Sequence, residues 1–136
     1  MDDQIWLRTS LSAIVLIHFV VLLWHGIAHI LIPVPLSVLQ TVFVMFVILL
    51  MPLVGVALLR NNRRRTAAWL ITLSMLGALL FGFINHFIRA SSDYVLEVPA
   101  NTWRHGFATS AALLAVTETI GTVVGAAAVF RWRGTP

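Results

Sequence analysis

The chain has 136 residues, of which 60% are hydrophobic and 10% are charged, and its formal net charge is +4. With a mean hydropathy of +0.95, this composition excludes an ordinary soluble domain, in which about a quarter of the residues are charged, and it predicts an integral membrane protein. The chain has no cysteine, which excludes disulfides and thiol redox chemistry and leaves imidazole, carboxylate and backbone oxygen as metal ligands.

Four apolar stretches are each long enough to cross a hydrocarbon core of roughly 30 Å, a distance that takes about 20 helical residues. These stretches are residues 11–33, 38–59, 67–87 and 107–130. The connectors between the first three are short, whereas residues 88–106 form one longer loop. We therefore expect residues 1–136 to form a single all-α domain, a four-helix transmembrane bundle.

The positions of the arginines predict how the bundle is oriented. Two of the nine, Arg89 and Arg104, lie at one set of span ends. The other seven lie at the opposite set: Arg8, Arg60, Arg63, Arg64, Arg65, Arg131 and Arg133. Cytoplasmic loops carry an excess of basic residues, so we expect both termini in the cytoplasm and the longer loop outside, in a bacterial inner membrane. Because the arginines flank spans and form no separate basic domain, we expect no nucleic-acid partner.

The first span carries three of the five histidines. His18, His25 and His29 are spaced i, i+7 and i+11, so on a helix they lie within roughly 40° of one another. A polar stripe in hydrocarbon is costly and by default indicates a functional site that faces the bundle interior. His25 and His29 lie one turn apart on one face, as in helical metal sites. The span ends at Pro33 and Pro35, which cannot continue a helix.

The second and third spans carry few polar side chains. In the second span, Gln40 is the only strongly polar residue, and Pro52 is expected to bend the helix. The third span ends with Asn85 and His86 near the outer surface. Its small residues favour close helix packing: Ser74, Gly77, Ala78 and Gly82.

The loop at residues 88–106 is too long for a tight turn, and we expect it to fold over the outer mouth of the bundle. Its acidic residues, Asp93 and Glu97, are expected to be solvated charges rather than ligands, although a loop that covers a metal site could bring one of them in. His105 lies beside the start of the last span and is expected to be a residue of the membrane interface.

The fourth span has a polar centre. Glu118 lies almost at its middle, where an ionisable group indicates function. Gly121 and Gly125 form a GxxxG pair, which we interpret first as a close packing surface within the bundle and second as a homodimer face.

Depth along the spans predicts that four of these side chains converge. Side chains lean towards the N-terminus of their own helix. His25, His29 and His86 should therefore reach inward, while Glu118 reaches outward. Three imidazoles and one carboxylate suit Zn(II), Fe(II) or Cu(II), and a bound cation would offset the cost of burying the glutamate. We predict these four residues as metal ligands in the outer half of the membrane, with three supporting residues: His18, Gln40 and Asn85.

Two other functions fit parts of the pattern. In the first, His25 or His29 and His86 are the axial ligands of a haem b used for electron transfer or haem handling. In the second, the protein is a non-catalytic scaffold, or a proton or ion pathway through His18 and Glu118. The sequence leaves open whether the protein is an enzyme. With no soluble domain, its expected partners are membrane lipids and a lipid-soluble substrate such as a quinone.

Overall fold

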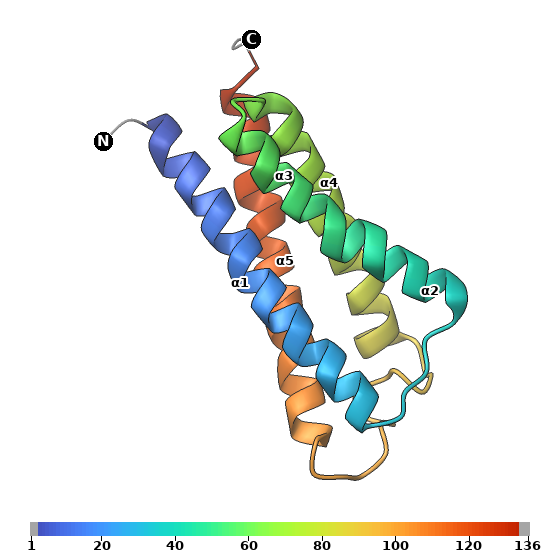
Figure 1. Ribbon diagram of the computed structural model, residues 1–136. Helices are drawn as coiled ribbons and strands as arrows, with labels where there is room; N and C mark the ends of the chain where they lie inside the picture. Colours follow the sequence, from blue (N-terminus) through green and yellow to red (C-terminus); the bar gives the residue numbers. More distant parts are fainter. Residues whose placement is uncertain (1–2, 134–136) are drawn as a thin grey trace.

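The computed structural model describes residues 3–133, and within this range the chain is helical with no strand. Four long helical rods run alongside one another (Figure 1). They are α1 (Asp3–Leu31), a continuous rod of α2 (Val38–Phe43), η1 (Val44–Leu50) and α3 (Met51–Arg60), a rod of α4 (Arg64–Phe83) and η2 (Ile84–Ile88), and α5 (Arg104–Arg131). The predicted all-α class is confirmed. Each rod is also long and apolar enough to span a membrane.

The helix is distorted ahead of Pro52, as expected, and the distortion is the π-helical segment η1. A proline has no N–H to donate and crowds the carbonyl four residues before it. The backbone widens ahead of it, and the N–H of Met51 donates to the carbonyl of Phe46, five residues back. Pro52 itself lies in the first turn of α3 and is buried. At the start of this rod, Ser37 and Gln40 form a capping box, so the Gln40 side chain is used at the helix end.

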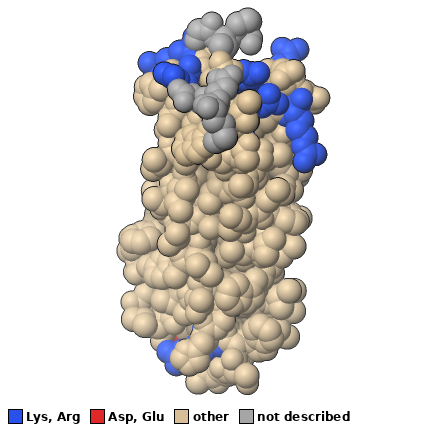
Figure 2. Space-filling model, turned by 90° about the vertical axis from the view of Figure 1, so that its left-hand side faces the viewer, with Lys and Arg blue, Asp and Glu red and all other residues tan. Residues whose placement is uncertain are grey.

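The two ends of the molecule differ in charge. The start of α1, the α3–α4 turn and the end of α5 lie together and carry the seven arginines named above; we call this the arginine-rich end (Figures 1 and 2). The opposite end, formed by residues 32–37 and 89–103, is called the loop end. The surface between them in Figure 2 carries no charged side chain. At the arginine-rich end, Arg8 donates to the carbonyl of Leu59 at 2.8 Å, and Arg64 bonds to Gln4.

The larger of the two buried apolar clusters of the described residues lies towards the arginine-rich end, and α5 contacts both α1 and α4. Gly125 and Gly121 are buried there against α4: a Cβ at Gly125 would collide with Thr72, and one at Gly121 would meet Met75. The glycine pair therefore serves as a close packing surface within the chain, the first of its two interpretations. A homodimer through this pair stays a prediction, although α4 already covers both glycines.

At the loop end, residues 89–103 fold back over the helix ends. The N–H of Val95 donates to the carbonyl of His86 at 3.0 Å, and the Asn101 side chain donates to the carbonyl of Leu31 at 3.2 Å. Val98 is buried in a small apolar cluster that includes Ile32 and Phe107. The connector therefore covers the loop end, as expected.

Candidate metal centre

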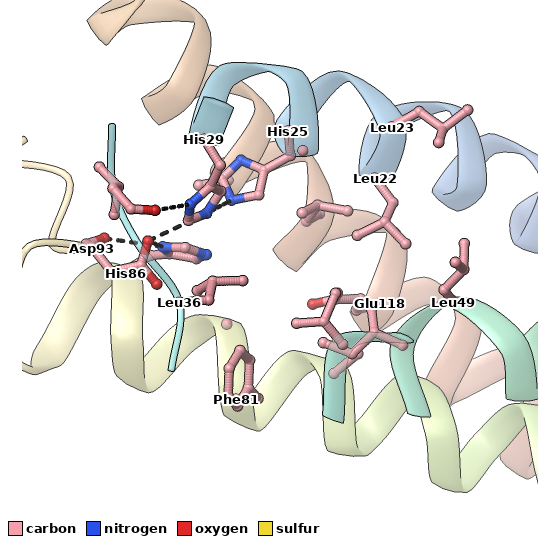
Figure 3. Close-up of a pocket in the computed structure, with 18 of the residues that line it drawn as sticks. Leu22, Leu23, His25, His29, Leu36, Leu49, Phe81, His86, Asp93 and Glu118 are labelled. Carbon is pink, nitrogen blue, oxygen red and sulfur yellow. Dashed lines mark hydrogen bonds and ion pairs between the residues drawn. The ribbon is translucent and has the colours of Figure 1, made fainter. Parts of the chain in front are cut away.

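Three of the predicted ligands come together near the loop end. His25 and His29 project from α1, and His86 projects from η2 (Figure 3). One ligand nitrogen from each ring lies within 4.8 Å of those of the other two, a spacing that could hold a metal ion. His25 and His86 are buried, and 13% of the His29 side chain is exposed. The helical spacing of His25 and His29 explains why they share a face, and the end of the α4–η2 rod brings His86 to the same depth.

The ring of His25 is held in one orientation by α5. Its Nδ1 lies 2.9 Å from Oγ of Ser110. That hydroxyl donates its own proton to the carbonyl of Phe107 at 3.0 Å, so it accepts a hydrogen bond from Nδ1–H of His25. In a neutral imidazole with its proton on Nδ1, Nε2 carries the lone pair. The contact therefore prepares Nε2 of His25 to bind a cation.

The other two rings are held in the same way by backbone carbonyls. Nδ1 of His29 donates to the carbonyl of Val34 at 3.2 Å, and Nδ1 of His86 donates to the carbonyl of Asp93 at 3.0 Å. A second hydrogen bond on the far ring nitrogen is the usual support of metal-ligating histidines. All three neutral rings are thus left with a lone pair on Nε2.

The closest contact in the group joins two of these nitrogens. Nε2 of His25 and Nε2 of His29 lie 3.2 Å apart. Two lone pairs at this separation repel unless a proton or a cation lies between them. Nitrogens bound at about 2.0–2.1 Å to one tetrahedral ion lie about 3.3 Å apart, which agrees with the observed separation.

Asp93 is buried beside the three histidines, contrary to the expectation that it is a solvated loop charge. Only 4% of it is exposed, and its Oδ1 lies 3.3 Å from Nε2 of His29 and 3.4 Å from Nδ1 of His86. Neither carboxylate oxygen has a hydrogen-bond partner among the described residues. A turn in which Tyr94 N–H donates to the carbonyl of Ser91 brings Asp93 back over the helix ends. A buried carboxylate needs a cationic partner, so Asp93 favours a cation in this group.

Glu118 does not join the three histidines. It is buried in the middle of α5, and its Oε1 lies 4.0 Å from Nδ1 of His18. Thr117 Oγ1 lies 3.5 Å from the same nitrogen. The Glu118 side chain does not extend to the level of the three histidines. Its carboxylate instead lies near His18, which comes earlier on α1. Its predicted role as a ligand stays a prediction, while Asp93 lies closer to the group.

The three predicted supporting residues lie elsewhere. His18 contacts Glu118, and Gln40 caps α2. Asn85 donates to the carbonyl of Phe81 at 2.8 Å within its own helix. The residue that does support the group, Ser110, was missed. The sequence could have indicated it, because Ser110 is a polar residue in an apolar span, about two helical turns before Glu118.

A haem does not fit between these rings as they stand. Axial histidines bind on opposite faces of the macrocycle, which would lie between the two rings. The rings of His25 and His86 instead contact each other edge to face, with their centroids 4.8 Å apart, and His29 lies against both. Rings that lie this close together could instead share a single metal ion.

The histidine group opens into a cavity of about 540 Å³ between the helices. Figure 3 shows His25, His29, His86 and Asp93 gathered at one end of it and Glu118 apart from them. The rest of the lining is mostly apolar and comes from α1, η1, α4 and α5. An ion held by the histidines would therefore face a largely apolar space.

No protein family, curated protein or solved structure matches this chain.

Proposed function

We propose that this protein spans a membrane four times and binds one transition-metal ion through His25, His29 and His86, with Asp93 as the fourth ligand. The contact between the two Nε2 atoms of His25 and His29 carries this proposal, because both Nδ1 atoms already donate to oxygens. The buried carboxylate beside them supports it. Three imidazoles and a carboxylate suit Zn(II), Fe(II) or Cu(II).

The proposed orientation places the arginine-rich end in the cytoplasm and the loop end outside. Its support is the excess of arginines at one end, combined with the absence of charged side chains from the surface between the two ends on the face drawn in Figure 2. In this orientation the metal ion lies in the outer half of the membrane, under the cover of residues 89–103. A molecule that enters the cavity from the lipid would meet the ion directly, which makes a lipid-soluble substrate the class that this site would act on.

Metal analysis of detergent-purified protein tests the proposal. Wild type is compared with His25→Ala and His86→Ala, and with His105→Ala as the matched control, because His105 is exposed and lies outside the group. Each sample is loaded separately with Zn(II), Fe(II) and Cu(II), and optical spectra report any haem. We expect close to one ion per chain in wild type and His105→Ala, and loss of the ion in the two cavity variants.

A metal-free wild type would overturn the proposal in favour of a proton on Nε2 of His29, which would lie between His25 and Asp93 and satisfy both contacts. Circular dichroism and size-exclusion chromatography check that each variant folds. Cobalt(II) added to the wild type gives a second readout, because its visible spectrum reports nitrogen and oxygen ligands without any substitution. A spectrum of hexaaqua cobalt alone would contradict the site.

A further inference from the structure

The cavity beside the histidine group reaches the side of the molecule between α1 and η1. Leu23 and Ile27 of α1 and Met45 of η1 line it, and each is 50% exposed. A side chain that is half exposed and also lines a cavity lies at its mouth. Gly26 lies at the same mouth, and a Cβ placed there would meet no atom within 4 Å. The mouth is therefore apolar and open.

The mouth lies in the apolar part of the molecule, between two of the helical rods. Figure 1 shows that α1 and the α2–η1–α3 rod lie closest near the arginine-rich end and separate towards the loop end. The lining residues of both rods belong to the apolar stretches that are suited to cross a membrane. In a membrane the mouth would face acyl chains rather than water, so only a molecule dissolved in the lipid would reach it.

The interior is apolar along its length and polar at its ends. Leu22, Ile48 and Leu114 are among the apolar side chains that line it. His29 and Asp93 lie at one end, where a cation is favoured. A ligand that fits this pattern has an apolar body and a head group that a cation attracts, and oxygen is the head-group atom that both a metal ion and a protonated imidazole bind.

We propose that this cavity binds one lipid-soluble molecule with an apolar body and a single oxygen-bearing head group, taken up sideways between α1 and η1. The head lies against the histidine group, and this contact rests on the proposed metal site. The volume of about 540 Å³ agrees with ligand sites of roughly 300–1,000 Å³ that hold one small molecule. A whole two-chain phospholipid is larger than this space.

Photo-crosslinking in lipid nanodiscs tests the inference, with palmitic acid that carries a diazirine in the middle of its chain as the probe. Labelled residues are identified by mass spectrometry. We expect saturable labelling of cavity residues such as Leu22, Ile48 and Leu114, and competition by unlabelled palmitic acid. Gly26→Phe fills the mouth and should lower this labelling at least about tenfold, because the apolar contacts that hold the chain are lost. Val20→Phe is the matched control, since Val20 is exposed on α1 and does not line the cavity.

The metal content of the same samples separates this inference from the proposed function. Labelling that is spread over lipid-facing side chains and unchanged in Gly26→Phe would overturn the cavity site, whether or not metal is bound. Cavity labelling in a metal-free wild type would support the cavity site and overturn the metal function. If Gly26→Phe fails to fold, Ala115→Leu fills the cavity from α5 instead, with the same expected loss of labelling.

Discussion

Oε1 of Glu118 lies 4.0 Å from Nδ1 of His18, so these two buried ionisable side chains face each other and lie apart from the histidine group. Within the described residues, Nε2 of His18 has no hydrogen-bond partner. Side chains of this kind hold membrane helices together through polar contacts worth under about 1–2 kcal/mol each. The pair therefore lies between α1 and α5 away from the histidine group, and Glu118 is part of the cavity lining (Figure 3).

The two buried carboxylates should respond differently to neutral replacement. Asp93→Asn removes the carboxylate beside His29 and His86, and we expect metal affinity to fall about 10–100-fold, the range found when groups around a metal site are changed. Glu118→Gln leaves those contacts intact and should leave the affinity unchanged. Because Asp93 is itself proposed as a ligand, the range of about 10–100-fold, which applies to groups that support the ligands, is the smallest loss expected. Competition with a chromophoric chelator measures both variants. Equal losses in the two variants would restore Glu118 as a ligand and place the ion deeper.

Ser110→Ala should weaken metal binding without touching a ligand. The hydroxyl fixes the ring of His25 through Nδ1, and a histidine without this support loses about 10–100-fold in metal affinity. Ser74→Ala is the control, because Ser74 is also a buried serine that donates to a carbonyl of its own helix, far from the histidines. Identical chelator titrations for the two variants would show that the orientation of the ring is set elsewhere.

Metal should stabilise the fold, because an ion that binds only the folded chain adds its binding free energy. At a free metal concentration of 100 times Kd the gain is about 2.7 kcal/mol. Thermal unfolding in detergent should therefore shift to a lower Tm when a chelator is added. His25→Ala should unfold at the same Tm with and without the chelator, and a chelator-dependent shift in that variant would mean that the ion binds elsewhere.

Replacing glycine by alanine should change the stability of the protein differently at Gly125 and at Gly77. Gly125→Ala would place its Cβ 3.3 Å from the Cα of Thr72 on α4, and overpacking of this kind costs about 1–3 kcal/mol. Gly77→Ala meets side-chain atoms only at 3.5 Å and 3.7 Å, so it should be neutral or slightly stabilising because alanine favours helix. Tm values in detergent compare them. An unchanged Tm for Gly125→Ala would show that α4 and α5 can separate there at no cost.

Single cysteines can report the orientation, because the chain has none of its own. Asn62 lies in the α3–α4 turn and Leu96 in the connector at the loop end, and both are exposed. In intact cells, a membrane-impermeant maleimide should label Leu96→Cys and leave Asn62→Cys unlabelled until the cells are lysed. The opposite pattern would place the arginine-rich end outside.

The sequence could predict the features that depend on position along a helix. His25 and His29 share a face because they are four residues apart on one rod, and His86 reaches the same depth because its span ends near the surface. Pro33 and Pro52 likewise indicated where a helix ends and where one is distorted. The positions of the histidines follow from helical rise and rotation, and the effects of the two prolines follow from their missing N–H.

The remaining parts of the site depend on how separate elements meet. Glu118 is of a metal-ligating type and lies at the centre of its helix. The direction of its side chain depends on how α5 is rotated against α1, and the sequence pattern does not show this rotation. Asp93 lies in a connector without a repeating pattern, and its burial depends on one turn at Ser91. Sequence reasoning therefore found the residues of the helical stripe, but it expected Asp93 in solvent and not buried beside the histidines.

The uneven packing of this molecule has an evolutionary consequence. Leu11, Ile71 and Trp132 belong to the core near the arginine-rich end, whereas Leu23 and Met45 border the cavity mouth and contact no part of that core. If the cavity takes the proposed ligand, substitutions at the mouth would alter which molecule is accepted and leave the unfolding free energy within about 0.5 kcal/mol, as is usual for exposed positions. Such a scaffold would acquire new ligand preferences through single mutations, without first accumulating stabilising changes.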